Sequence, residues 1–238
     1  MCLLLVVLSV VMFAACTGKP EQTEKQAESH TEAPAVDSGE KQRLQQVLET
    51  VCSADEALEL AKKSNAVVFE TKGCVFGKET WDAFYEKVSK GAPAIVLCAN
   101  YYTLSREGIS DELYEQQKDK YPQLVFNLLE YDGETFVLRW HESTVEYIGN
   151  RDTYKYLLHF TGDAPSEAAR YTQYDNYVLV NDPTVTWDKI FLSICSSQLG
   201  DYIPHHVIYK TISVGRTETD KKKYRAFRFV SAAHINGK

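Results

Sequence analysis

Six consecutive apolar residues, Ala94–Ala99, constrain the fold of this chain more than any other segment. A strand without polar positions has to be covered on both faces, and such strands are often parallel to a neighbour. The preceding residues, Lys78–Lys90, place Trp81 and other apolar side chains at the spacing of one helix face. Gly91 and Pro93 end that helix just before the apolar run. We therefore expect a sheet with helices packed against it.

The remaining elements are predicted from hydrophobic periodicity and from turn-forming residues. Helices are expected at Lys41–Val51, Ser53–Lys63, Asp111–Lys120, from Asn150 or Asp152 to Gly162, and at Thr186–Ser197. Strands are expected at Ala66–Glu70, Gln123–Tyr131, Glu134–Trp140, Thr144–Ile148, Tyr177–Val180, His206–Val214 and Tyr224–Ser231.

Some of these boundaries depend on particular residues. Ser53–Glu56 has the sequence of a capping box, which opens a helix. Asp132 and Gly133 form the dipeptide that is typical of a β-hairpin turn. Gly73 and Gly77 are expected to bracket a turn. The sum is an α+β fold: a mixed sheet with flanking helices, a hairpin meander in its middle and a hairpin at its C-terminal end.

The N-terminal residues are expected to be a targeting segment that is not part of the folded domain. Leu3–Ala15 is apolar except for one serine, which is too short to cross a bilayer but fits the hydrophobic region of a signal peptide. The residues that follow, Phe13-Ala14-Ala15-Cys16, resemble the lipobox of bacterial lipoproteins. The resemblance implies that residues 1–15 are removed and that the Cys16 sulfur carries a diacylglyceryl group, often with acylation of the new amino end. An ordinary cleaved signal peptide and a buried N-terminal helix are the alternatives.

A polar tether is predicted between Cys16 and the folded part. Residues 16–41 contain no aromatic side chain, and Val36 is the only large aliphatic one. Such a segment buries too little apolar area to offset the entropy of ordering it, so we expect it to be disordered. Residues 42–238 are then expected to form a single domain, with a sub-boundary near 161–165 as the alternative.

Charge and cysteine content limit the classes of function. Residues 42–209 carry ten more acidic than basic residues, which argues against a nucleic-acid partner. Beyond Cys2 and Cys16, four cysteines remain, and outside the cytoplasm they form either two disulfides or free thiols. They are Cys52, Cys74, Cys98 and Cys195. No two of them have the spacing of a zinc site.

Cys74 is the candidate for chemistry. The predicted order from Ala66 to His159 is strand, helix, strand, helix, strand, strand, helix, which resembles the thioredoxin core. The resemblance implies a reactive thiolate at Cys74, near a helix N-terminus, with a cis-proline at Pro122 beside it. The alternative is a structural cysteine, since a second cysteine does not follow Cys74 in the manner of the redox motif.

The other chemistry-bearing groups favour structural or surface roles. Neighbouring histidines on a strand point to opposite faces, so His205 and His206 do not suit one metal ion. His141, with Glu142 and Glu146, has no spacing of an acid–base or ligand set. The basic cluster around Lys221–Lys223, with Arg225 and Arg228, reads either as a contact with anionic envelope material or as a solvated loop and a charged edge strand. Three tyrosine-rich stretches suit either packing or a glycan or peptide groove, and they are Tyr101–Tyr102, Tyr154–Tyr156 and Tyr171–Tyr177.

These patterns favour a lipid-anchored protein on the extracytoplasmic face of a bacterial membrane. The expected role is a non-catalytic binding or structural module without metal or cofactor, acting on an envelope protein or a glycan. A divergent thioredoxin-like thiol protein that uses Cys74 is the first alternative, and a solute-binding lipoprotein is the second.

Overall fold

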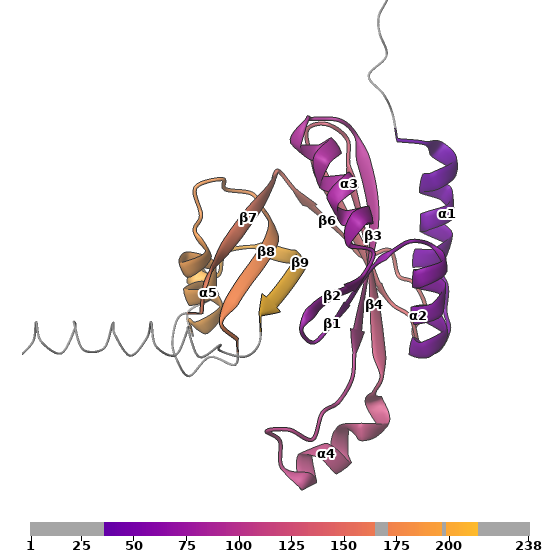
Figure 1. Cartoon of the computed structure of the whole chain (residues 1–238), viewed down its shortest axis with the longest axis vertical. Coiled ribbons are helices and arrows are strands. Elements are labelled where there is room, and N and C mark those ends of the chain that lie inside the picture. The colour runs from indigo at the N-terminus through magenta and orange to yellow at the C-terminus, as the bar shows by residue number, and fades with distance from the viewer. Residues whose placement is uncertain (1–35, 165–170, 197–198, 214–238) are drawn as a thin grey trace, which may run out of the picture. The chain divides into compact units, whose positions relative to one another are not determined.

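The computed structural model describes residues 36–164, 171–196 and 199–213. Within these ranges the helices are α1 (Ser38–Leu48), α2 (Ala54–Lys63), α3 (Lys78–Ser89), α4 (Asp111–Gln117) and α5 (Trp187–Cys195), with 3-10 turns η1 (Lys118–Lys120) and η2 (Leu199–Asp201). The strands are β1 (Val67–Glu70), β2 (Gly73–Phe76), β3 (Ala94–Tyr102), β4 (Gln123–Tyr131), β5 (Phe136–Glu142), β6 (Arg151–Tyr154), β7 (Tyr156–Asp163), β8 (Gln173–Val180) and β9 (His205–Ser213). The α+β prediction is confirmed (Figure 1).

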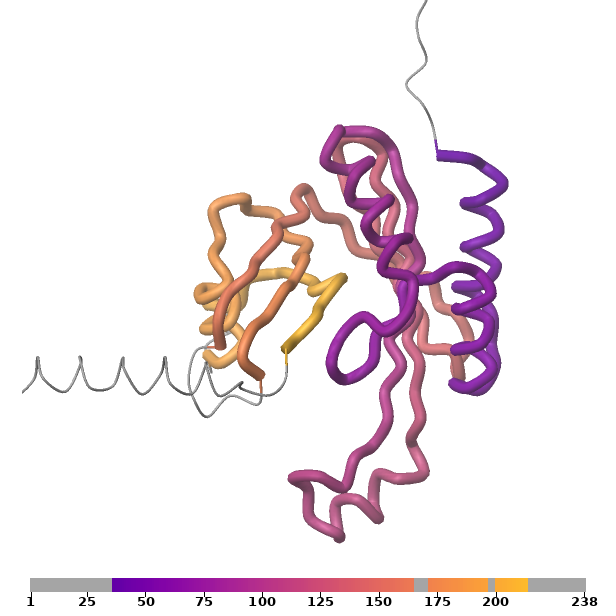
Figure 2. Tube along the Cα trace, in the orientation of Figure 1, coloured from indigo at the N-terminus to yellow at the C-terminus, as the bar shows by residue number. Residues whose placement is uncertain are grey.

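The nine strands form one mixed sheet that curls on itself. Their order is β6-β5-β4-β3-β1-β2-β9-β8-β7, and β1 with β3 is the parallel pair within it. β6 and β7 stand at opposite ends of this order, yet only Lys155 separates them in the sequence. The two ends of the sheet therefore come together at Lys155. Figure 2 shows the chain running directly from one half of the sheet into the other.

The curl produces an inner and an outer face, and both are covered. Trp81 and Phe84 of α3 pack on the inner face with side chains from both halves of the sheet, including Phe69, Leu179 and Tyr209. On the outer face, α1 and α2 cover β1, β3 and β4. α5 covers the outer face of β8 and β9 through Ile190. Ala94–Ala99, the apolar run, lies in β3 at the centre of these layers and is buried on both faces, as predicted.

Several predicted elements are confirmed because their determinants are local. The capping box at Ser53 is formed, with Glu56 N–H donating to the Ser53 hydroxyl and the Glu56 carboxylate accepting from Ser53 N–H. Tyr131 pairs with Phe136, so Asp132 and Gly133 lie in the predicted hairpin loop. Thr186 caps α5 through its hydroxyl.

The predicted helix from Asn150 or Asp152 to Gly162 is wrong, because these residues form β6 and β7. Leu157 packs against the inner core and Leu158 against the outer cluster under α5. Both faces of β7 therefore bury apolar groups, and neighbouring apolar residues imitate the spacing of a helix face. The predicted strand at Thr144–Ile148 is also wrong, since β5 pairs with β6 instead and Ile148 is 79% exposed.

The turn predicted between Gly73 and Gly77 is wrong as well, because Gly73–Phe76 is a strand. β2 pairs with β1, and its register partner in β9 is Thr211, which lies opposite Gly73. A Cβ on Gly73 would lie 2.6 Å from the Thr211 Cα, and the residue has φ of +127°. Gly73 is thus required where the two halves of the sheet meet, rather than at a turn.

Two helices differ in detail from the prediction. α1 begins at Ser38, where the Asp37 side chain accepts a hydrogen bond from Gly39 N–H, so residues 38–41 of the predicted tether are helical. α1 ends at Leu48, so Val51, predicted to be its last residue, lies beyond it and is exposed. Of the apolar residues Ile190, Phe191 and Ile194 in α5, Ile190 is fully buried, while Phe191 and Ile194 are about half exposed.

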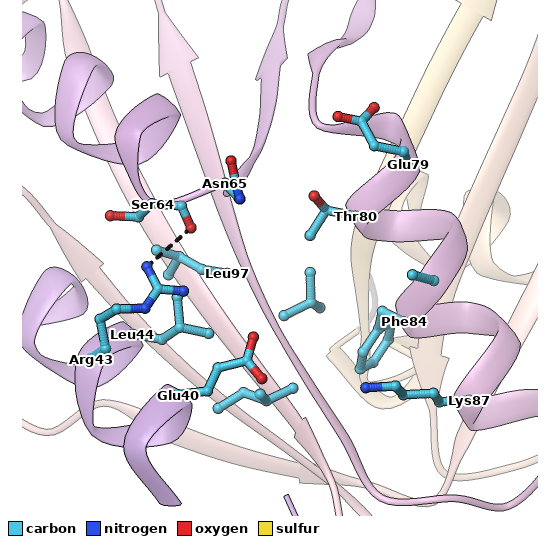
Figure 3. A pocket seen from close by; sticks show the side chains of 13 residues that line it. Glu40, Arg43, Leu44, Ser64, Asn65, Glu79, Thr80, Phe84, Lys87 and Leu97 are labelled. Carbon is cyan, nitrogen blue, oxygen red and sulfur yellow. Dashed lines mark hydrogen bonds between the residues drawn. The ribbon is translucent and has the colours of Figure 1, made fainter. Parts of the chain in front are cut away.

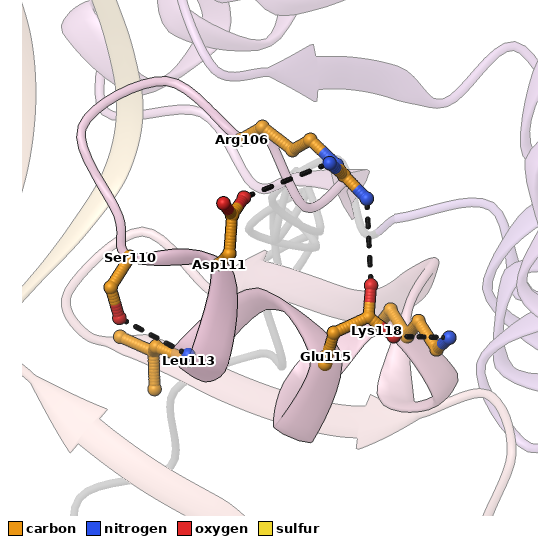
Figure 4. A network of polar contacts seen from close by, with 6 residues as sticks. All are labelled: Arg106, Ser110, Asp111, Leu113, Glu115 and Lys118. Carbon is orange, nitrogen blue, oxygen red and sulfur yellow. Dashed lines mark hydrogen bonds and ion pairs between the residues drawn. The ribbon is translucent and has the colours of Figure 1, made fainter.

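β3 and β4 are joined by an arm that carries α4 away from the sheet (Figures 1 and 2). No residue of α4 is buried, as expected for its thin apolar face. Local contacts hold it: the Ser110 hydroxyl accepts from Leu113 N–H, and Arg106 reaches Asp111 at 3.7 Å and Glu115 at 3.4 Å (Figure 4). The arm is therefore stabilised within itself.

Several predictions fall on residues that the structure does not describe. They are the signal peptide over residues 1–15, Cys16, the tether up to residue 35, the basic cluster and the strand at Tyr224–Ser231. Among the helices of the described residues, none has the length and apolarity needed to span a membrane.

Candidate functional site

A groove lies between α1 and α3 in the described part of the chain. β1 begins at Val67 opposite Cys98, so Ala94–Leu97 of β3 has β4 on one side and no described strand on the other. α1 covers one face of β3 there and α3 covers the other. The groove therefore opens onto the unpaired edge of a strand.

The walls of this α1–α3 groove combine apolar and charged groups. Its lining residues are Glu40, Arg43 and Leu44 of α1, Ser64 and Asn65, then Glu79, Thr80, Ala83, Phe84 and Lys87 of α3, and Ile95, Val96 and Leu97 of β3. The groove has a volume of about 340 Å³. A second recess of about 350 Å³ shares Glu40, Lys87 and Ile95 with it and extends it towards Val36.

Figure 3 shows how the charged side chains lie. Glu40 and Lys87 enter the groove from opposite walls, and Glu79 stands at its far end. Arg43 donates to the Ser64 carbonyl at 3.4 Å, which ties α1 to the end of α2. The two acids and two bases balance, so the groove selects no strong net charge. The groove thus combines a main-chain edge, an apolar floor and charged rims.

Cys74 does not lie in the environment that the thioredoxin resemblance implies. It is on β2, packed against the inner core, and its Sγ donates to the Phe76 carbonyl at 3.4 Å. Burial raises the pKa of the Cys74 thiol, which opposes thiolate formation. The Tyr121–Pro122 peptide bond is cis, but β1 and β3 lie between β2 and β4. Three strand spacings of about 4.8 Å each therefore separate Cys74 from Pro122.

Cys98 lies in the inner core against which Cys74 packs, whereas Cys52 packs against the outer cluster under α1 and α2. All four are free thiols, and burial raises the pKa of Cys52 and Cys98 as well. Cys98 is fully buried in β3, whereas Cys195 is exposed at the end of α5.

The histidines have structural surroundings. His141 is buried, with Nδ1 2.5 Å from the Leu48 carbonyl and Nε2 2.6 Å from the Val145 carbonyl, and so joins the end of α1 to the loop after β5. His205 Nδ1 lies 2.7 Å from the Ile203 carbonyl, and burial lowers the pKa of His206 to about 4. The described residues contain no group of three metal-ligating side chains.

Sequence reasoning missed an aromatic cluster that joins α3 to β7–β9. The His159 ring stacks on Tyr177 at 4.0 Å and pairs with Asp175 at 2.7 Å. Tyr177 in turn packs edge-on against Trp81 and Tyr85. Because β7 was expected to be helical, His159 could not be placed opposite Tyr177. The tyrosines of the 171–177 stretch that the structure describes are thus largely packing residues, and Tyr174 lies against Trp187.

The groove was missed too, because no motif marks it. It depends on where β1 begins relative to β3, and this register is a property of the assembled sheet. Comparison of the chain with family models, with curated proteins and with solved structures found no match. The site is therefore argued from its own geometry.

Proposed function

We propose that this chain is a lipid-anchored protein of the bacterial cell envelope whose domain binds an extended segment of another envelope protein. The Phe13–Cys16 sequence and the polar residues after it support the anchor. α1 begins at Ser38, which leaves about twenty residues between Cys16 and the fold. As a flexible chain these would reach about 25 Å, enough to lift the domain off a membrane surface.

The unpaired edge of β3 is the observation that carries the binding function. A strand edge presents main-chain N–H and C=O groups, and an extended peptide satisfies them by adding a strand. Residues Ala94–Leu97 offer such an edge within a recess, where walls from two helices contact alternate side chains of the incoming segment. A glycan lacks the repeating main-chain donors and acceptors that match this edge, so a protein is the favoured partner.

Anchoring is tested by replacing Cys16. The wild-type chain should incorporate labelled palmitate and sediment with membranes, whereas Cys16→Ala should do neither. A Cys16→Ala chain that stays in the membrane fraction would contradict the anchor.

Groove binding is tested by photo-cross-linking in cells that produce the full chain. A photoreactive residue at Ala83, which is exposed in the groove wall, should give one defined protein adduct. The matched control is Ser89, which is exposed on the same helix but outside the groove lining. Thr80→Trp, which fills the groove, should abolish the Ala83 adduct. Adducts that form equally from both positions, or that persist after Thr80→Trp, would refute binding of a protein segment in the groove. An adduct with a glycan would show that the groove binds a glycan instead.

A further inference from the structure

Another recess, lined by Lys41 of α1 and by residues of β4, β5 and β6, concentrates positive charge. Arg139 of β5 and Arg151 of β6 are register partners, directly opposite each other in an antiparallel pair. Like charges in that position repel and destabilise the pair. Lys41 of α1 lies beside them, since it lines the same recess. Three cations thus converge on one part of the outer face. We term this site the arginine pocket, and it is formed by Lys41, Arg139 and Arg151 together with Glu130.

Within this pocket one carboxylate, that of Glu130, faces the three cations. Glu130 pairs with Lys41 at 2.6 Å through one oxygen and with Arg139 through the other. The side chains of Glu130 and Arg139 are only 16% and 15% exposed. Arg139 also donates to the Gln45 side chain at 2.9 Å, while its Nε is buried without a partner among the described residues.

Glu130 pairs with Lys41 and Arg139 but not with Arg151. Within the described ranges Arg151 forms no ion pair, and it is exposed at the mouth of the pocket. Asp132 lines the adjoining recess, and its carboxylate, which accepts hydrogen bonds from Glu134 N–H and from the N–H and hydroxyl of Thr135, is a second negative charge nearby. Two carboxylates thus face three cations. The pocket therefore keeps an uncompensated positive charge, although residues 42–209 as a whole are strongly acidic.

The space beside Arg151 is large enough for a ligand group. Two adjoining recesses of about 440 Å³ and 160 Å³ share Lys41, Glu130, Val137 and Arg151 in their walls. Guanidinium groups match the oxygens of carboxylates and phosphates with paired hydrogen bonds. We propose that the arginine pocket binds an oxyanion, a phosphate or carboxylate group, with Arg151 as the principal contact and Lys41 as the second. This proposal does not depend on the α1–α3 groove.

The test uses the full chain with Cys16→Ala and inorganic phosphate as the probe, titrated by calorimetry at constant ionic strength. We expect saturable binding in the millimolar range. Arg151→Gln, a change at an exposed position, should weaken binding about tenfold or more, because it removes a charge-assisted contact. Glu130→Gln should tighten binding, because it removes the carboxylate that competes for Lys41 and Arg139. Lys155→Gln, a change at an exposed cation that directly follows β6, is the matched control and should leave binding unchanged.

Parallel titrations identify the source of the anion. Acetate tests a carboxylate, and vesicles of phosphatidylglycerol, compared with phosphatidylcholine vesicles, test an anionic headgroup. Binding of acetate or of phosphatidylglycerol vesicles supports the arginine pocket only if Arg151→Gln weakens that binding while Lys155→Gln does not. Absence of saturable binding for all three probes, or equal effects of Arg151→Gln and Lys155→Gln, would overturn the proposal. If Glu130→Gln fails to fold, Arg151→Lys, which keeps the charge without the fork, should give intermediate affinity.

Discussion

Replacing Gly73 with alanine tests the point where the two halves of the sheet meet. An added Cβ would lie 2.6 Å from the Thr211 Cα and 2.8 Å from the Lys210 carbonyl oxygen, and neither main-chain atom can rotate away. Holding a non-glycine residue at φ of +127° costs about 1–3 kcal/mol, and relieving the overlap costs about 1–3 kcal/mol more. We therefore expect the free energy of unfolding to fall by about 2–6 kcal/mol. This loss is a large part of the free energy of unfolding of a typical domain, which is roughly 5–15 kcal/mol.

Urea unfolding of the Cys16→Ala chain measures this loss, with Gly149→Ala as the matched control. Gly149 also has a positive φ, of 76°, but an added Cβ there meets nothing within 4 Å. The control should lose only about 1–2 kcal/mol, the cost of the backbone conformation alone. If Gly73→Ala is no more destabilising than Gly149→Ala, then β2 and β9 do not approach each other at this residue, and the sheet order is wrong.

Three further outcomes follow from buried groups. Burial lowers the pKa of His206 to about 4 against about 6.5 when unfolded, so the neutral ring stabilises the fold above pH 6.5. Up to about 3 kcal/mol should be lost as the pH falls from 6.5 to 4, and His206→Gln should show a smaller loss over that interval in urea unfolding. His141→Phe should cost about 2–4 kcal/mol, because the Leu48 and Val145 carbonyls lose their contacts with the two ring nitrogens, at least one of which donates, and a loss below about 1 kcal/mol would contradict that role. In native protein at pH 8, Cys98, buried and with a raised pKa, should resist alkylation while exposed Cys195 reacts, as mass mapping of the labelled cysteines would show.

The elements predicted correctly are those whose determinants are close in sequence. The capping box at Ser53 and the hairpin at Asp132-Gly133 each involve a few neighbouring residues. Ala94–Ala99 could be assigned to a doubly covered strand because composition alone shows it. In each case the local preference and the assembled fold agree.

The wrong predictions concern residues whose conformation is set by contacts with distant parts of the chain. Leu157 and Leu158 resemble part of a helix face only because both faces of β7 are covered, a fact that belongs to the curled sheet. Gly73 resembles a turn residue, whereas its lack of a side chain serves a contact with Thr211, far along the chain. The groove and the arginine pocket depend on strand register, so neither could be found before the strand order was known.

Amide hydrogen exchange at Ala94–Leu97 tests the central claim most directly. In the purified chain, amides on the unpaired edge of β3 have no strand partner among the described residues and should exchange faster than those of Leu124–Leu128 in fully paired β4. In the anchored protein within its own membranes, a bound segment should slow exchange at Ala94–Leu97, and Thr80→Trp should remove that protection. Equal exchange in the purified and anchored states would contradict strand addition at this edge.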